Sequence, residues 1–178
     1  KEKLRLRSYG VPDMNSKVFL EIKKKYRGLV NKRRTTLELG EAYDFIETGV
    51  KPELQDYMNG QVLNELEYCL NLYDLEPKVY IAYDRLAYFE KGNDDLRISF
   101  DTNIRTRRSD LLLESGDHGK RLLDSDVWLM EIKTSLAKPL WLCEMLSEFE
   151  IRSSSFSKYG TEYKNIMARQ KEMPKQKI

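Results

Sequence analysis

Apolar and polar residues alternate along the first part of the chain with the period of a β-strand. In such a strand, residues two positions apart point to the same face. The alternation predicts three strands, over residues 2–8, 17–26 and 29–37. Turn-forming residues separate them, at 9–13 and at Arg27-Gly28. We therefore expect antiparallel strands joined by short turns in this part of the chain.

One short pattern occurs twice, at residues 19–23 and again at residues 128–133. Each copy is an extended apolar segment that carries a carboxylate and an ammonium two residues apart. Glu21 therefore shares a strand face with Lys23. Glu131 shares one with Lys133 in the same way. A half-buried strand with a solvated charged face would explain one copy alone. The same arrangement recurs in strand after strand with cations in excess, which favours a charged concave surface.

The middle of the chain changes to a helical period. Apolar residues at helical spacing predict a helix from about residue 60 to 75, with Asn59 as its cap, and a shorter helix over residues 41–47. Aromatic and alternating segments then predict two strands, over residues 79–89 and from residue 96 onward. Asn103, Arg105 and Arg107 are expected to continue the alternation of the second strand.

Two more helical segments are predicted near the end of the chain. After the second copy of the charged pattern, Pro139 is expected in the first turn of a helix. Residues 156–160 predict a helix start or a tight turn, and the polar residues from Met173 onward predict a disordered tail. No linker is long enough to divide the chain into two domains.

Composition narrows the classes of function. The chain has 31 basic and 29 acidic residues and a net charge of +2, so any polyanion site must come from local clustering of cations. Cys69 and Cys143 lack metal-type spacing and suit reduced core thiols in a cytosolic protein. His118 is the only histidine, so catalytic triads and histidine-rich metal sites have almost no support, and an exposed loop position is expected for it. No apolar run approaches the ~20 residues that span a bilayer, and we expect a soluble, cytoplasmic protein.

One face of the predicted strands collects cations and a few carboxylates. If antiparallel strands close into a barrel, this face points inward and helices cover its apolar back. Arginine forks, lysine ammonium groups and a carboxylate-bound divalent ion would together suit a chain of phosphates. An open sheet with its charges in water fits the alternation equally well. The residues of this face are Arg5, Arg7, Glu21, Lys23, Lys32, Arg34, Tyr83, Arg85, Arg97, Asp101, Glu131 and Lys133.

Six motifs occur in order along the chain. They are Lys3-Leu4-Arg5-Leu6-Arg7-Ser8-Tyr9-Gly10, Phe19-Leu20-Glu21-Ile22-Lys23, Tyr83-Asp84-Arg85, Leu96-Arg97-Ile98-Ser99-Phe100-Asp101-Thr102, Met130-Glu131-Ile132-Lys133 and Ser155-Phe156-Ser157-Lys158-Tyr159-Gly160. Together they resemble the polyphosphate polymerase domain of the vacuolar transporter chaperone (VTC) family, and most of all its bacterial relatives. That family belongs to the triphosphate tunnel metalloenzymes, also called the CYTH-like fold. The resemblance implies an α+β fold with an antiparallel β-barrel tunnel and flanking helices, over residues 1–170, followed by a polar tail at 171–178. It also implies that an early helical and basic strand segment of the family is missing here, which would leave a gap in the barrel.

The resemblance further implies an activity and a set of site residues. The activity is transfer of the ATP γ-phosphate to a growing inorganic polyphosphate chain with Mn²⁺ or Mg²⁺, so ATP and polyphosphate are the implied partners. We expect no nucleic-acid partner, because aromatics and cations form no evident exposed stacking groove, and the sequence shows no membrane segment. Arg85, Arg97 and Glu131 would be catalytic, with Glu131 as the metal ligand. A triphosphatase of the same fold, or a polyphosphate- or nucleotide-binding module without turnover, are the alternatives. The implied phosphate-binding residues are Arg5, Arg7, Lys23, Lys32, Tyr83, Arg85, Arg97, Ser157 and Lys158.

Overall fold

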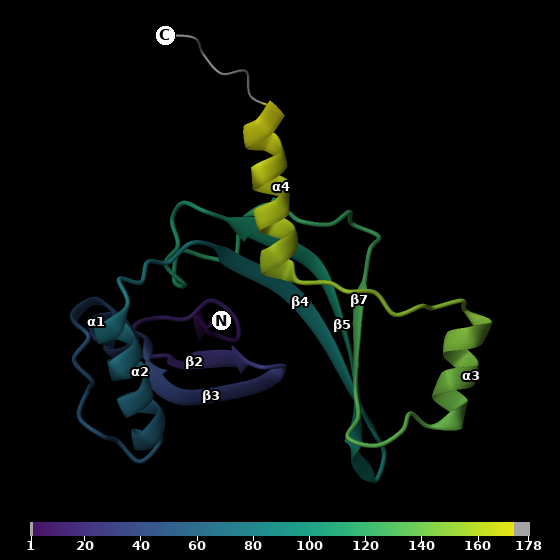
Figure 1. Ribbon diagram of the computed structural model, residues 1–178, viewed down its shortest axis with the longest axis horizontal. Coiled ribbons are helices and arrows are strands. Elements are labelled where there is room, and N and C mark those ends of the chain that lie inside the picture. Colours follow the sequence, from purple (N-terminus) through teal and green to yellow (C-terminus); the bar gives the residue numbers. More distant parts are fainter. Residues whose placement is uncertain (1, 173–178) are drawn as a thin grey trace. The chain divides into compact units, whose positions relative to one another are not determined.

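A computed structural model describes residues 2–172, without the side chains of residues 93, 94 and 172 (Figure 1). The chain forms two compact units. The first comprises Lys1–Lys78 and Asp110–Asp117, and the second comprises Val79–Ser109 and His118–Ile178. The tail predicted from Met173 onward lies outside the described residues. Assignment of residues 1–170 to one domain stays a prediction.

The first unit is built on a three-stranded antiparallel sheet in the order β1-β2-β3. Its strands are β1 (Glu2–Arg7), β2 (Lys17–Tyr26) and β3 (Leu29–Glu38), which confirms the three predicted strands to within a residue. Arg27 and Gly28 form the two-residue turn between β2 and β3, and both have positive φ, at 46° and 86°. Such turns match the twist of the strands they join, and glycine adopts this φ without strain.

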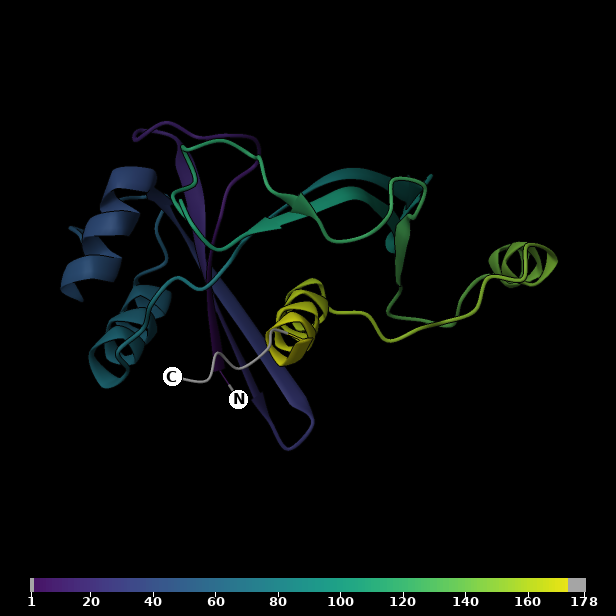
Figure 2. The ribbon, with the colours of Figure 1, turned by 90° about the horizontal axis from the view of Figure 1, so that it is seen from above.

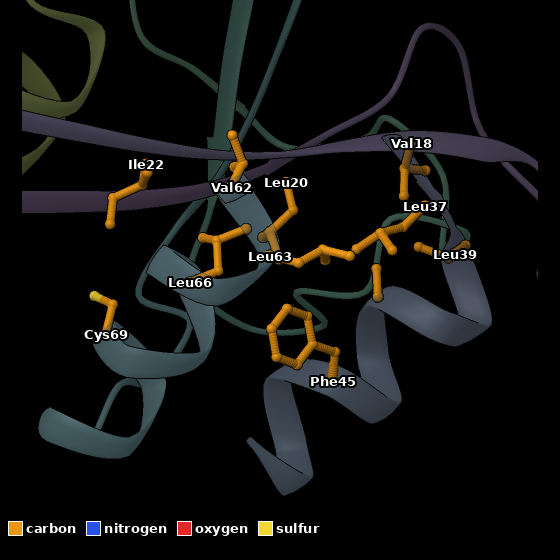
Figure 3. Close-up of a cluster of buried hydrophobic side chains, with 11 residues drawn as sticks. Val18, Leu20, Ile22, Leu37, Leu39, Phe45, Val62, Leu63, Leu66 and Cys69 are labelled. Atoms are coloured by element: carbon orange, nitrogen blue, oxygen red, sulfur yellow. The ribbon is translucent and has the colours of Figure 1, made fainter. Parts of the chain in front are cut away.

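Two helices, α1 (Leu39–Thr48) and α2 (Gly60–Leu72), cover one face of this first sheet. The side chain of Asn59 accepts a hydrogen bond from the backbone N–H of Val62 at 3.1 Å, which confirms the predicted cap of α2. Figure 3 shows Phe45 of α1 facing the apolar side chains of β2 and α2. The core follows the strand period, because alternate residues of β2 enter it. Its buried members include Val18, Leu20, Ile22, Leu37, Leu39, Phe45, Val62, Leu63, Leu66 and Cys69.

The second unit contains another antiparallel sheet, in which β5 is the central strand. Its strands are β4 (Tyr80–Glu90), β5 (Asn93–Arg107), β6 (Lys120–Arg121) and β7 (Leu129–Lys133). β5 pairs with β4 on one side and with β6 and β7 on the other. The two predicted strands of this region are confirmed, although β5 is longer than expected. His118 is an exposed loop residue, as predicted.

A bulge in β5 overturns one sequence prediction. The register between β4 and β5 shifts next to Ala82 and Asp84, and Asn103 has a φ of 48°. An extra residue in one strand changes the face to which the following residues point. Arg105 accordingly lies beside Asp84, with its Nη1 3.3 Å from the carboxylate Oδ1. Asp84 points away from the face of Arg85, so Arg105 does not continue the face of Arg97 and Asp101.

The remaining helices are α3 (Leu140–Glu148) and α4 (Lys158–Glu172). Pro139 is the N-cap of α3 and does not lie in its first turn, one position from the prediction. Both views show α3 set apart from the strands of its unit (Figures 1 and 2). Cys143 of α3 is exposed, so the prediction of a core thiol holds for Cys69 and is wrong for Cys143. Within residues 2–172, none of these helices combines the length and apolarity needed to cross a membrane.

The described strands do not close into the predicted barrel. They form two separate sheets, and β1, β3, β4, β6 and β7 are edge strands. A barrel requires each strand to pair on both sides. The predicted helix cover is also confined to the first sheet, because Leu86, Tyr88 and Trp128 of the second unit are about half exposed. The fold is therefore α+β with antiparallel sheets.

Candidate functional site

The register of the first sheet gathers cations on the face opposite its core. Residues directly across an antiparallel pair share a face. Arg5 of β1 lies across from Glu21, and Glu21 lies across from Arg34. The neighbouring row across the three strands consists of lysines alone, and Arg7 occupies the row on the other side of Glu21. We call this surface the basic face, made of Lys3, Arg5, Arg7, Glu21, Lys23, Lys32 and Arg34.

Glu21 is the buried centre of the basic face, with a side chain that is only 2% exposed. Arg5 donates to its Oε2 from Nε at 2.8 Å and also from Nη2. Lys32 Nζ forms an ion pair with Oε1 at 3.1 Å, and Arg7 donates to the same oxygen from Nη1 at 3.4 Å. Burial by itself would raise the pKa of Glu21, but the hydrogen bonds and charges of Arg5 and Lys32 outweigh it and lower that pKa. Glu21 is therefore an ionised counter-ion for several cations.

Two other cations of the basic face have a different environment. Lys23 and Arg34 are exposed, and within the described part of the chain neither forms an ion pair. The guanidinium carbon of Arg34 lies 4.8 Å from the centroid of the Phe19 ring. These groups can receive an anion without first giving up a carboxylate. The structure thus brings together all four phosphate-binding residues that the sequence predicted in this unit, Arg5, Arg7, Lys23 and Lys32.

The second sheet carries a face of different composition. Asp101 lies across from Arg85, Ser99 lies between Ala87 and Glu131, and Arg97 lies between Phe89 and Lys133. Cations and carboxylates therefore alternate over a small area. We call this the mixed face, made of Tyr83, Arg85, Arg97, Ser99, Asp101, Glu131 and Lys133.

Asp101 is the buried centre of the mixed face and is also 2% exposed. Arg85 donates hydrogen bonds to both of its oxygens, from Nε to Oδ1 and from Nη2 to Oδ2, the second at 2.7 Å. Lys158, from the first turn of α4, donates to Oδ2 as well. Burial opposes the negative charge and would raise the pKa of Asp101, but hydrogen bonds from Arg85 and Lys158 lower it overall. The hydrogen bond with Asp101 in turn raises the pKa of Arg85 above its ordinary value.

Tyr83 and Ser157 lie beside these charged groups. The Tyr83 ring lies within 5.0 Å of the Arg85 guanidinium and 4.4 Å of Lys158 Nζ. Such cation–π contacts stabilise both cations next to the ring. Ser157 precedes α4, where its hydroxyl accepts a hydrogen bond from the backbone N–H of Gly160 at 3.1 Å. The structure therefore assembles Tyr83, Arg85 and Lys158, and Ser157 directly precedes Lys158 in the sequence.

Glu131 differs from the two buried carboxylates because its side chain is 49% exposed. One oxygen lies 3.5 Å from Lys133 Nζ, and the other lies 3.9 Å from Arg85 Nη2. Arg97, in the neighbouring strand, lies with its guanidinium 5.2 Å from the Phe89 ring and forms no ion pair with a described residue. The mixed face thus offers an accessible carboxylate and an arginine that has no carboxylate partner among the described residues.

A family model described as the VTC domain matches residues 1–167. The chain belongs to the VTC domain family. The match includes both units and therefore both charged faces, and it confirms the resemblance carried by the six motifs. A search of curated proteins gives no match for the chain. Membership of this family indicates a function related to polyphosphate for this VTC domain.

The carboxylates of this VTC domain differ in whether they could supply a ligand to a divalent metal. Among the residues described, no three histidine, cysteine or acidic side chains cluster in a way that could hold a metal ion. Mg²⁺ in phosphate-transferring sites is typically held by one or two carboxylates together with phosphate oxygens and water. The exposed carboxylate of Glu131 can supply such a ligand, whereas Glu21 and Asp101 have both oxygens occupied by cations.

Sequence reasoning placed Glu21 and Asp101 on the charged faces but gave them no role. Their function as centres of cation clusters depends on which residues lie across from them, 16 positions away along the chain in the pairs with Arg5 and Arg85. The Arg108–Glu162 pair was not found from the sequence either, since 54 residues separate its members. A carboxylate in the middle of a strand that follows a strand alternating arginine with leucine is the signal that could have identified Glu21 in this VTC domain.

Proposed function

We propose that this VTC domain is a metal-dependent polyphosphate polymerase, which transfers the γ-phosphate of ATP to an inorganic polyphosphate chain. The exposed carboxylate of Glu131 among Arg85, Arg97 and Lys133 is the observation that carries this proposal. A surface that only binds polyanions gains nothing from an accessible carboxylate, which repels phosphate. The same carboxylate becomes useful when a divalent ion lies between it and the phosphates.

The transfer needs no nucleophile from the protein. A terminal oxygen of the polyphosphate chain attacks the γ-phosphorus, and a new P–O bond forms. The bond from that phosphorus to the β,γ-bridging oxygen breaks, and its electron pair leaves with ADP. Catalysis of such a step consists mainly of alignment and neutralisation of charge.

Each group of the two faces has a part in this scheme. Arg85 and Arg97 bind and orient non-bridging oxygens by their planar forks, with Tyr83, Ser157 and Lys158 as further phosphate-binding groups. Glu131 would hold Mn²⁺ or Mg²⁺, which supplies positive charge to the phosphate oxygens when bound. Arg5, Arg7, Lys23 and Lys32 of the basic face bind other phosphates of the chain.

Incubation of the chain with ATP and Mn²⁺, followed by separation of polyphosphate from free phosphate, tests the proposal. We expect long chains from the wild type and none from Glu131→Ala or Arg97→Ala. Lys24→Ala is the matched control, because Lys24 lies on the opposite face of β2 and pairs with Glu2 at 3.6 Å. Free phosphate alone would identify a triphosphatase. Binding of polyphosphate without turnover would identify a binding module and contradict the polymerase.

A further inference from the structure

Two arginines, one on each charged face, are held by a buried carboxylate in the same way. Arg5 donates from Nε and Nη2 to Glu21, and Arg85 donates from Nε and Nη2 to Asp101. A guanidinium carries five N–H groups in one plane. The side edge of each arginine is therefore occupied, and the end edge, formed by Nη1 and the outer N–H of Nη2, donates no hydrogen bond to a described residue.

The carboxylate and the arginine of each pair differ in their exposure to solvent. The carboxylates of Glu21 and Asp101 are 2% exposed, whereas Arg5 is 50% exposed and Arg85 is 22% exposed. Each carboxylate thus lies behind its arginine, and the arginine separates it from solvent. The end edge of the guanidinium is the part that can meet a ligand. A fork whose plane and position are fixed in advance loses less conformational entropy when it binds phosphate.

Each buried carboxylate also holds a lysine. Lys32 Nζ lies 3.1 Å from the Oε1 of Glu21, and Lys158 Nζ donates to the Oδ2 of Asp101. Every oxygen of both carboxylates therefore contacts at least one cation, so a metal ion would have to displace a cation to reach them. Two roles remain for these carboxylates. They could lower the net positive charge of the face, or they could hold particular cations in fixed positions.

We propose that Glu21 and Asp101 are positioning residues for a chain of phosphates. Glu21 holds Arg5 with Lys32, and Asp101 holds Arg85 with Lys158. The inference rests on the proposed function only in taking the ligand to be a chain of phosphates. Neither carboxylate touches that ligand. Each acts through the cations that it holds.

The sign of a change in affinity separates positioning from simple reduction of charge. Removal of a negative charge from a cationic face strengthens binding of a polyanion if only net charge matters. Removal of a positioning carboxylate weakens binding, although the face becomes more positive. Glu21→Gln and Asp101→Asn remove one negative charge each while keeping the size of the side chain. Glu148→Gln is the matched control, because it removes the same charge from an exposed carboxylate of α3, outside both charged faces.

The experiment is calorimetric titration of the full chain with inorganic tripolyphosphate in the absence of metal. We expect Glu21→Gln and Asp101→Asn each to weaken binding by roughly tenfold or more, the equivalent of one lost charge-assisted hydrogen-bond network. Glu148→Gln is expected to bind as tightly as the wild type or more tightly. Unchanged or tighter binding by the first two variants would overturn the inference, as would a wild type that does not bind tripolyphosphate.

Two further measurements keep the result interpretable. In ¹⁵N spectra, the Nε–H signals of Arg5 and Arg85 should exchange slowly with water in the wild type and rapidly in the variants, while backbone signals stay native. If Glu21→Gln does not fold, Glu21→Asp keeps the charge and withdraws the carboxylate by one methylene, and it should still weaken binding. Failure of the polymerase assay with this pattern of binding intact would count against the proposed function alone, because the titration contains neither ATP nor metal.

Discussion

Lys23 and Lys24 are neighbours in β2 and point to opposite faces of the first sheet. Lys23 belongs to the basic face, whereas Lys24 pairs with Glu2 at 3.6 Å. We expect Lys23→Gln to weaken binding of tripolyphosphate by about 1 kcal/mol, a factor of roughly five. Lys24→Gln should have no such effect, although it removes the same charge. Calorimetry at two salt concentrations checks this, and equal losses for the two variants would show that only net charge matters.

Stability at acidic pH should depend on Glu21. A carboxyl group whose pKa is lowered by folding stabilises the native state above its unfolded pKa, and this stabilisation is lost as the pH falls through the folded value. The pKa of Glu21 lies below its ordinary value of 4.5, despite burial, because Arg5 and Lys32 hold its charge. We expect the free energy of unfolding to decrease as the pH falls below about 4.5.

Urea unfolding at a series of pH values, followed by circular dichroism, measures this dependence. Glu21→Gln cannot ionise, so the variant should be less stable at neutral pH and should lose less stability on acidification. Parallel curves for the variant and the wild type would show that Glu21 makes no contribution to the pH dependence. Asp101, whose pKa is also lowered, should account for a further part of the slope.

For single residues, the sequence predicts the strand face on which a side chain lies better than it predicts the residues that the side chain contacts. The period of two assigned Glu21, Lys23 and Lys32 to one face correctly, because it depends only on local strand geometry. The contacts of Glu21 with Arg5 and Lys32 depend on the register of three strands, which the alternation does not determine. Arg105 shows the limit even for faces, since the bulge at Asn103 changes the side to which it points.

Helix α4 is attached to the end of β5 through a pair of charged side chains. Arg108 donates to both oxygens of Glu162, from Nε and Nη2, each at 2.8 Å. Glu162 is buried, whereas Arg108 is partly exposed, so solvent weakens the pair. This attachment keeps the first turn of α4 in a position where Lys158 reaches Asp101.

Glu162→Gln should therefore loosen α4 without unfolding the rest of its unit. We expect hydrogen exchange over residues 158–172 to accelerate by an amount equivalent to about 1–3 kcal/mol, the usual contribution of a hydrogen bond to a charged group. Exchange in β4 should change little. Glu148→Gln, at an exposed position of α3, is the control and should leave α4 protected. Equal protection of α4 in both variants would mean that the Arg108–Glu162 pair does not hold the helix.

The strands and helices themselves were largely predictable, because each has a local signal. Asn59 caps α2 by the mechanism that its sequence position predicts. Strand β6 was missed, since Lys120 and Arg121 are too few to show any alternation. The N-cap position of Pro139 differs from the prediction by one residue, within the usual uncertainty of helix ends. Closure of the barrel has no local signal, because it depends on pairing between edge strands.

The two units of the molecule differ in how their apolar residues are buried. The first contains a contiguous core in which α1 and α2 pack on β2 and β3. In the second, Leu86, Tyr88 and Trp128 of the sheet region and Met145 of α3 are about half exposed. Burial of apolar surface is the main favourable contribution to folding. We therefore expect the strongest protection from hydrogen exchange in β2 and α2.

A substitution in this core tests whether the units unfold separately. Phe45 is fully buried, and Phe45→Ala should destabilise the first unit by about 3–5 kcal/mol through loss of contacts and creation of a cavity. Both tryptophans, Trp128 and Trp141, belong to the second unit, so their fluorescence reports on that unit alone. With independent units, Phe45→Ala should accelerate hydrogen exchange in β2 and α1 while the fluorescence transition in urea stays in place. A fluorescence transition that moves to lower urea together with the loss of protection would show that the two units unfold as one cooperative domain.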